Sequence, residues 1–294
     1  MSDHDRILSM LMEKAYLEVI PTRTIVDRLV HLPRHSYVAI TCSPVHGIEP
    51  TLKMVEELRA LPEERRLKLI PHIAARLVRD KGHLREILTR LQEQKVESIF
   101  VPGGDADRPA GDYDCSLDLL RDMAEIGHGV EDVGVASHPE GHPLVDDEEL
   151  IRLLREKQAY ATYLVTQMCF DPAVLIDWLR RVRREGVTLP AWIGLPGVAE
   201  VGKLLSLSLR IGVGQSVRVL KRQKGLVRQM VTGRPYQADG LVDGIKAYLD
   251  DPVLNIPGFH LFSFNNVEPT ERWRLETVRR HREAAEQVHA EVPQ

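Results

Sequence analysis

The sequence predicts an α/β protein in which strands and helices alternate to form a single (β/α)8 TIM barrel. Short apolar runs bounded by turn residues recur along the chain, and each is followed by a segment with apolar residues at helical spacing. Eight such units fit into 294 residues without a linker rich in Gly, Ser or Pro. This regularity favours a closed barrel, with a doubly wound open sheet as the alternative.

The elements follow one another in a regular order. Strands are predicted at 16–20, 36–41, 67–73, 96–103, 132–137, 162–169, 189–198 and 258–265. Helices are predicted at 22–32, 49–61, 81–94, 115–126, 146–158, 172–185 and 268–289. The stretch at about 200–250 is too long for one helix, so we expect extra helices there, within a single domain that spans 1–294.

Composition excludes several classes of partner. The net charge of −4 gives no electrostatic reason to bind nucleic acid or an anionic membrane. No apolar run approaches the roughly 20 residues of a membrane span, and the first residues lack a signal-peptide core. The three cysteines form no C-x-x-C pair, which fits a reduced, cytoplasmic protein. The sequence carries no signal for or against an oligomer.

One stretch, 96–109, reads VESIFVPGGDADRP and combines a buried strand with an exposed carboxylate. Its apolar residues run directly into Gly103, Gly104 and Asp105. In parallel β/α folds the chemistry gathers at the carboxyl ends of strands, so Asp105 is a candidate site residue. The structural alternative is that the glycines only form a turn and Asp105 only caps the next helix.

Polar residues stand at the ends of other predicted strands as well. A carboxylate is costly to bury, so Glu18, between Leu17 and Val19, is expected to be functional. Gln167 lies in an apolar strand, where a buried amide needs partners and can read a heteroaromatic edge. The remaining candidates are Thr41, His72, His138, His142 and Asn265. The His138–His142 run is broken by proline and adds no ligands at helical spacing, so no metal site is predicted.

These strand ends together resemble the methylenetetrahydrofolate reductase family over nearly the whole chain. The order and spacing of the motifs carry the resemblance, rather than any one of them. They are Glu18-Val-Ile-Pro21, Val38-Ala-Ile-Thr41, Pro71-His72-Ile73, Gly104-Asp105, His138-Pro-Glu-Gly-His142-Pro143, Thr166-Gln167-x-x-Phe170-Asp171 and Phe259-His260-Leu-Phe-Ser-Phe-Asn265.

The resemblance implies reduction of 5,10-methylenetetrahydrofolate to 5-methyltetrahydrofolate, a step of one-carbon metabolism and methionine biosynthesis, with hydride from NADH or NADPH. By resemblance, Glu18 is the general acid that protonates the departing ring nitrogen, and Asp105 favours the cation that follows ring opening. The implied folate-binding residues are Asp105, Gln167, Phe262 and Asn265. The implied cofactor-binding residues are Thr41, His72, Gly104, His138, His142 and Lys157.

The chain also departs from the family pattern, mainly on the flavin side. The family's arginine before Gly-Asp is replaced by Gly103 and its tyrosine before Pro-Glu by His138. Its helix-five aspartate falls near Leu150, and its arginine after the last Asn is replaced by Asn266. These losses favour weak or absent FAD and a direct nicotinamide donor. The alternatives are an FAD-dependent member of the family, a non-catalytic folate-binding barrel, and a corrinoid-linked methyltransferase barrel.

Overall fold

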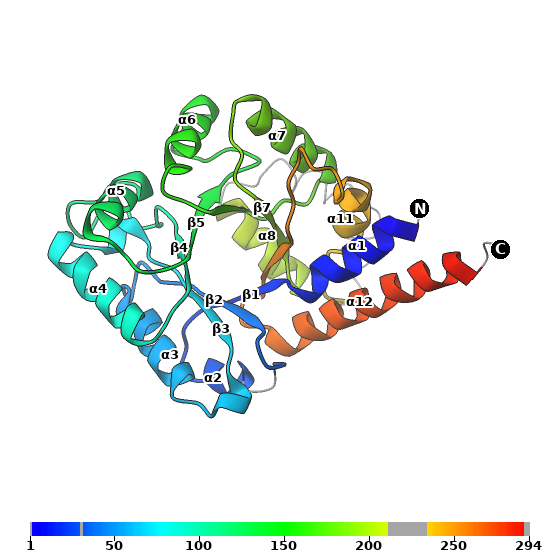
Figure 1. Ribbon diagram of the computed structural model, residues 1–294, viewed down its shortest axis with the longest axis horizontal. Coiled ribbons are helices and arrows are strands. Elements are labelled where there is room, and N and C mark those ends of the chain that lie inside the picture. The colour runs from blue at the N-terminus through cyan, green and yellow to red at the C-terminus, as the bar shows by residue number, and fades with distance from the viewer. Residues whose placement is uncertain (1, 30–31, 211–233, 291–294) are drawn as a thin grey trace. The chain divides into compact units, whose positions relative to one another are not determined.

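The computed structural model describes residues 2–29, 32–210 and 234–290, and confirms the predicted (β/α)8 barrel (Figure 1). Its eight strands belong to one sheet in the order β3-β2-β1-β8-β7-β6-β5-β4. A parallel bridge between His72 and Phe100 joins β3 to β4, the two ends of that order. The doubly wound open sheet is therefore wrong.

Each predicted strand is present, and most are shorter than predicted. The strands are β1 (Tyr16–Val19), β2 (Tyr37–Ile40), β3 (Lys68–Pro71), β4 (Ser98–Val101), β5 (Asp132–Ser137), β6 (Tyr163–Thr166), β7 (Ala191–Pro196) and β8 (Phe259–Phe262). The apolar runs extend beyond the ladders, because the residues that flank a strand are also buried. The shorter strands leave Thr41, His72 and Gln167 just beyond the carboxyl ends of their strands.

The helices follow the predicted order with one addition. They are α2 (Ile25–Leu29), α3 (Glu49–Arg59), α4 (Lys81–Glu93), α5 (Ser116–Ile126), α6 (Asp147–Lys157), α7 (Pro172–Arg184), α8 (Val201–Arg210), α11 (Asp239–Ile245) and α12 (Val267–Ala290), with 3-10 turns η1 (Glu63–Arg65), η2 (Ala75–Leu77) and η3 (Lys246–Tyr248). The addition is α1 (Ser2–Glu13), which the sequence analysis left unassigned. Part of the expected extra helical stretch, 211–233, lies outside the described residues.

The chain divides into two compact units, and the first comprises residues 16–136 and 153–165. Its parallel strands pair in a register that sets Glu18 beside Ala39, and Ala39 beside Ile70. Strand β4 pairs with β5 through Phe100 and Gly134. Buried aliphatic side chains of α3 and α4, such as Leu52 and Leu84, build its core, because both helices carry apolar residues at helical spacing.

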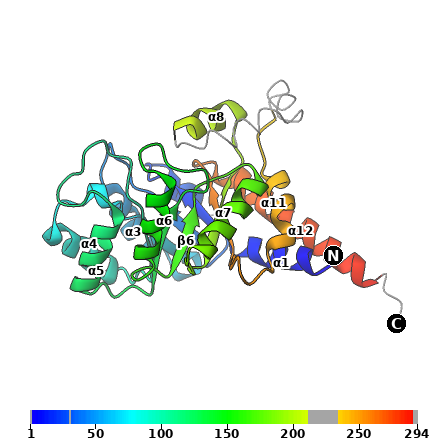
Figure 2. The ribbon, with the colours of Figure 1, turned by 90° about the horizontal axis from the view of Figure 1, so that it is seen from above.

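The second unit comprises residues 1–15, 137–152 and 166–294. Strands β7 and β8 pair through Gly194 and His260. A side chain on Gly194 would collide with the carbonyl oxygen of Thr166, so the close approach there requires glycine. Helix α1 lies along α12, and α11 lies next to α7 (Figure 2). Among the helices described, none has the length and apolar character needed to cross a membrane.

Candidate functional site

Glu18 is held in the first unit as a mostly buried carboxylate beside a histidine. It stands on β1 between buried neighbours, and 16% of its side chain is exposed. Its Oε2 lies 3.8 Å from Nε2 of His72, whose side chain is only 7% exposed. The two groups therefore lie within ion-pair distance of each other.

His72 is fixed by its backbone and by its ring. Its N–H donates to the carbonyl oxygen of Ile40 at 2.8 Å, which continues the β2–β3 ladder by one residue. Its ring packs against Phe100 with 4.7 Å between centroids. The imidazole therefore keeps one orientation next to Glu18.

Asp105 projects from the long loop that joins β4 to α5. The residue before α5 is Cys115, so the alternative that Asp105 caps that helix is wrong. Gly104 has φ of +98°, and a Cβ there would lie 3.0 Å from Cβ of Ala74. The turn therefore needs glycine at this position and leaves the Asp105 side chain exposed.

The charges of both Glu18 and Asp105 act on the thiol of Cys42. The pKa of its thiol is raised to about 11, mainly by burial and to a smaller extent by the negative charges of Asp105 and Glu18. Both carboxylates therefore lie close enough to act on one thiol. Asp105 and Glu18 thus belong to one electrostatic neighbourhood within the first unit.

Two predicted cofactor-binding residues of the first unit occupy different places. Thr41 follows β2, where its N–H donates to the carbonyl oxygen of Val19 at 2.9 Å and its own carbonyl oxygen accepts from the Thr51 hydroxyl at 2.7 Å. Lys157 ends α6, and burial lowers the pKa of its ammonium group, while the nearby Cys115 thiol acts in the opposite direction. Lys157 therefore lies beside the start of α5.

In the second unit, His138 and His142 form a ring pair on the loop after β5. Their centroids are 5.0 Å apart in an edge-to-face arrangement. A turn in which the Gly141 N–H donates to the His138 carbonyl oxygen at 3.2 Å brings the rings together. Nδ1 of His142 accepts from the Leu144 N–H at 3.2 Å, which assigns the proton of the neutral ring to Nε2. Within the described part of the chain, no three His, Cys, Asp or Glu side chains gather as metal ligands would.

Gln167 stands one residue beyond β6 rather than inside the strand. Its N–H donates to the carbonyl oxygen of Ser137 at 2.7 Å, which ties it to the end of β5. Its side-chain Oε1 accepts from the Met168 N–H at 3.0 Å. This bond fixes the plane of the amide, so that Nε2 points away from the Met168 backbone.

The end of β8 carries an aromatic pair and a strained turn. The His260 ring, which is buried, lies 5.0 Å from the Phe262 ring, and the Phe262 ring also packs against Gly194. Phe264 and Asn265 then adopt φ of +52° and +63°. Such left-handed conformations in consecutive non-glycine residues cost energy and are common at ligand sites.

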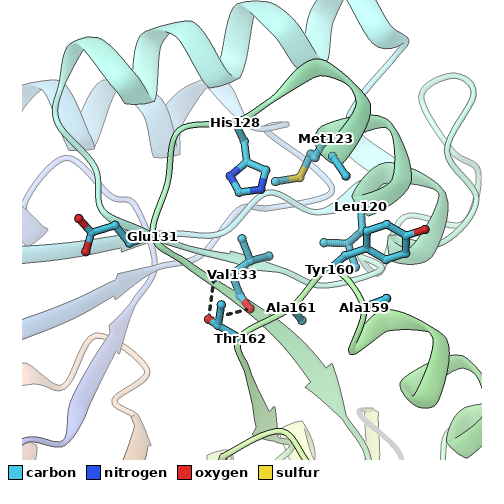
Figure 3. A pocket seen from close by; sticks show the side chains of 10 residues that line it. Leu120, Met123, His128, Glu131, Val133, Ala159, Tyr160, Ala161 and Thr162 are labelled. Atoms are coloured by element: carbon cyan, nitrogen blue, oxygen red, sulfur yellow. Dashed lines mark hydrogen bonds between the residues drawn. The ribbon is translucent and has the colours of Figure 1, made fainter.

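A cavity of about 290 Å³ in the first unit lies at the opposite end of its strands (Figure 3). It is lined by Met123, His128 and Tyr160, among others. Thr162 accepts from the N–H of Val133 at 3.0 Å on its floor, where β5 and β6 begin. Because Val133 and Thr162 stand at the amino ends of their strands, this cavity is separate from the group around Glu18.

Arg76 is a neighbour of the Asp105 loop that no sequence signal indicates. It lies on η2, and its guanidinium donates to carbonyl oxygens of the loop that carries Asp105. Bonds to backbone carbonyls leave no trace in residue type, so only the structure could reveal this contact.

Comparison with known proteins gives one consistent result. A family model described as methylenetetrahydrofolate reductase matches residues 20–272. The chain is 21% identical over 205 residues to methylenetetrahydrofolate reductase 2 of Schizosaccharomyces pombe, a match that covers 63% of this chain and 32% of that protein. Methylenetetrahydrofolate reductase 1 of the same yeast is 38% identical over 116 residues, covering 37% of this chain and 19% of the relative.

A probable methylenetetrahydrofolate reductase (NADPH) of Caenorhabditis elegans is 22% identical over 158 residues, covering 51% of this chain and 23% of the worm protein. The matched segment thus spans about a third or less of the length of these curated relatives.

Proposed function

The chain belongs to the methylenetetrahydrofolate reductase family, and we propose that it reduces 5,10-methylenetetrahydrofolate to 5-methyltetrahydrofolate with a nicotinamide as hydride source. The reaction consumes one hydride and one proton. The bond between the methylene carbon and one ring nitrogen breaks, and its electron pair and a proton go to that nitrogen. A bound nicotinamide supplies the hydride that the methylene carbon receives.

The observation that carries this proposal is the mostly buried Glu18 carboxyl, 3.8 Å from His72. A carboxyl sheltered from water is suited to hold a proton and release it to a positioned nitrogen. A module that only bound folate would gain nothing from burying this group, because burial costs free energy. Glu18 therefore acts as the general acid of ring opening in this proposal.

Asp105 acts on the charge that ring opening creates. When the proton reaches the departing nitrogen, the remaining nitrogen and the methylene carbon share a positive charge as an iminium ion. The exposed carboxylate of Asp105 acts on the same thiol as Glu18, which supports a place near the reacting atoms. A negative charge there stabilises the cation more than it stabilises the neutral substrate.

By resemblance, Gln167, Phe262 and Asn265 contact the folate in this proposal. Gln167 has an amide whose plane is fixed by the Met168 N–H, which suits it to read the edge of the pterin. The Phe262 ring offers an apolar face beside His260. Asn265 offers an amide on the strained turn after β8. These roles are carried over from the family pattern.

The cofactor-binding residues of the proposal are Thr41, His72, Gly104, His138, His142 and Lys157. One observation fits a dinucleotide. Lys157 is a half-buried cation whose ammonium pKa is lowered by burial, and a phosphate would offset its charge.

The same residues fit FAD less well, because the position of the family's arginine is Gly103. A bidentate arginine contact to a phosphate is worth about 1.5–3 kcal/mol, or roughly ten- to a hundredfold in affinity. We therefore propose that hydride passes directly from the nicotinamide, without tightly bound flavin. The FAD-dependent enzyme is the second candidate, and Arg108 and Arg155 are side chains that could replace the lost contact.

The test is a turnover assay on protein purified, unfolded and refolded to remove all flavin. NADH, and separately NADPH, is mixed with 5,10-methylenetetrahydrofolate, and both dinucleotide absorbance and 5-methyltetrahydrofolate are followed. Turnover without flavin is the expected result. A strict need for added FAD, or stoichiometric flavin on the purified protein, supports the second candidate instead.

The same assay separates the other readings. Folate binding without oxidation of either dinucleotide indicates a non-catalytic folate-binding barrel. Transfer of a methyl group to a corrinoid, with no dinucleotide oxidised, indicates a methyltransferase.

A further inference from the structure

The loop that carries Asp105 is held by one arginine from the neighbouring loop. Arg76 belongs to η2, which follows β3. Its Nε donates to the carbonyl oxygen of Ala106 at 2.8 Å, and its Nη2 donates to that of Asp107 at 3.0 Å. These two carbonyls belong to the residues immediately after Asp105.

The same side chain also holds the far end of the loop. Nη1 of Arg76 donates to the carbonyl oxygen of Asp114 at 3.1 Å and approaches its carboxylate at 3.4 Å. Three nitrogens of one guanidinium therefore bind three separate points of the chain. Only a planar fork with five N–H groups can do this, since a lysine ammonium is a single point of donors.

The backbone of Arg76 adds two more contacts to the loop, one before Asp105 and one after it. Its N–H donates to the carbonyl oxygen of Gly103 at 3.0 Å, and its carbonyl oxygen accepts from the Ala110 N–H at 2.9 Å. Contacts thus bracket Asp105 on both sides. A loop of this length would otherwise spread over many conformations, and ordering it costs conformational entropy.

The guanidinium of Arg76 binds mainly backbone carbonyl oxygens and not the carboxylate of Asp105. Among the described residues, every hydrogen bond recorded for the Arg76 side chain goes to Ala106, Asp107 or Asp114. The Asp105 carboxylate is thereby set in place without a direct hydrogen bond to a cation. This arrangement suits a group whose negative charge must act on a substrate.

We propose that Arg76 is a positioning residue that fixes Asp105 for the cationic stage of the reaction. The inference rests on the proposed function, in which Asp105 stabilises the iminium ion. A displacement of about 1 Å at such a group can cost roughly a hundredfold in rate. Loss of Arg76 is therefore expected to lower turnover far more than it lowers folate affinity.

The kinetic test is a double-mutant cycle with Arg76→Ala and Asp105→Asn. Arg76→Ala is expected to lower kcat by roughly ten- to a hundredfold, with less than a threefold change in KM for the dinucleotide. If Arg76 acts through Asp105, the same change made in the Asp105→Asn enzyme costs less than about threefold. Arg76→Lys, which keeps the charge but loses the fork, should recover only part of the rate.

The matched control is Arg90→Ala on α4 of the same unit. Arg90 binds Glu49 and Glu56 through its own fork, away from the Asp105 loop. Its loss should lower the thermal midpoint while kcat stays within about twofold of wild type. Wild-type kcat in Arg76→Ala, or an equal fold-loss in the presence and absence of Asp105, overturns the proposal.

Hydrogen exchange gives a readout that does not depend on turnover. Exchange of the amides in 102–115 should speed up in Arg76→Ala, with α4 unchanged. Unchanged exchange in that loop overturns the positioning role even if the wild-type protein has no reductase activity. If the loop exchanges faster in Arg76→Ala but the wild-type protein has no reductase activity, the loop is positioned as inferred and the proposed function is wrong.

Discussion

At the scale of single residues, the candidate site depends on groups whose neighbours hold them in place. Glu18 stands on a four-residue strand, and His72 beside it is set by a ladder bond and by Phe100. The surroundings of the Glu18 carboxyl are thus set by packing among the first four strands. The chemistry follows from that packing more than from the carboxyl group alone.

Glu18→Gln keeps the shape of the side chain and removes the transferable proton. Turnover should fall by roughly 10²–10⁴-fold, the usual range for a lost general acid, while folate affinity changes little. Steady-state dinucleotide oxidation and equilibrium folate binding measure the two effects. Glu57→Gln, an exposed change on α3, is the control and should leave turnover unchanged. Turnover close to wild type in Glu18→Gln would rule out its role as the acid.

Gly103→Arg tests whether the lost flavin contact lies at this residue. A Cβ at Gly103 meets no described atom within 4 Å, so the substitution should fold normally. FAD affinity should rise by roughly ten- to a hundredfold, as measured by flavin fluorescence titration. Gly104→Arg is the matched control, because its φ of +98° and the close Ala74 should make it destabilising. A folded Gly103→Arg protein with unchanged FAD affinity would contradict the assignment.

At the scale of elements, many residues of the candidate site lie at or just beyond the carboxyl ends of short strands. Most strands have four residues, so each contributes its last side chain or the next residue to the same region of its unit. Close contacts between neighbouring strands then limit which residues fit, in addition to the backbone pairing of the strands. In the second unit, Gly194 of β7 donates its N–H to the hydroxyl of Thr166 at 2.8 Å and leaves no room for a methyl group.

Gly194→Ala should therefore destabilise the protein by about 1–3 kcal/mol, the usual cost of overpacking. Urea unfolding at equilibrium measures the change in the free energy of unfolding. Gly202→Ala on α8 is the control, because a Cβ there meets no described atom within 4 Å and alanine favours a helix. Equal stability of the two variants would contradict the close contact.

At the scale of the whole chain, the first helix is tied to the last one within the second unit. Nη1 of Arg274 donates to the carbonyl oxygens of Met12 and Glu13, both at 3.1 Å, at the end of α1. At the other end of α1, Oδ1 of Asp5 lies 2.6 Å from Nδ1 of His281 and 2.7 Å from Nζ of Lys246. Side chains from three helical segments therefore meet at Asp5.

This cluster predicts a pH dependence of stability. Burial alone would raise the pKa of Asp5, but the hydrogen bonds and positive charges of Lys246 and His281 outweigh it and lower that pKa. A lowered carboxyl pKa contributes stability that is complete above the ordinary value of about 3.9 and is lost as pH falls through the folded value. Asp5→Asn should cost about 1.5–3 kcal/mol near neutral pH.

Denaturant unfolding at about pH 6 and about pH 3 checks this expectation. The difference between wild type and Asp5→Asn should shrink on acidification, because below its ordinary pKa the Asp5 carboxyl takes up a proton more readily in the unfolded chain than in the folded one. Asp3→Asn on the exposed side of α1 is the control. A difference that stays constant or grows at low pH would exclude the ionised Asp5 as its source.

The sequence predicted the barrel because alternation of apolar runs is a property of residue type and spacing. It also pointed to Glu18 as a carboxylate in a buried strand, and the structure places that side chain mostly out of solvent; the roles of Glu18 and Asp105 stay predictions. It missed α1, because a helix before the first strand belongs to no β/α unit. Arg76 was also missed, since its partners are backbone carbonyls, and the left-handed turn at Phe264 follows from tertiary packing that no local pattern encodes.

If Asn265 contacts folate as proposed, the turn after β8 implies a trade between stability and binding. Each non-glycine residue held at positive φ costs about 1–3 kcal/mol, so Phe264 and Asn265 reduce the margin by which the protein stays folded. Selection for thermal resistance alone would favour glycine here, at the expense of ligand affinity. Asn265→Gly should thus be at least as heat-resistant as the natural protein while holding folate more weakly. A library screened only for survival on heating should therefore enrich this change, and one screened for growth that depends on the reaction, with no product supplied, should discard it.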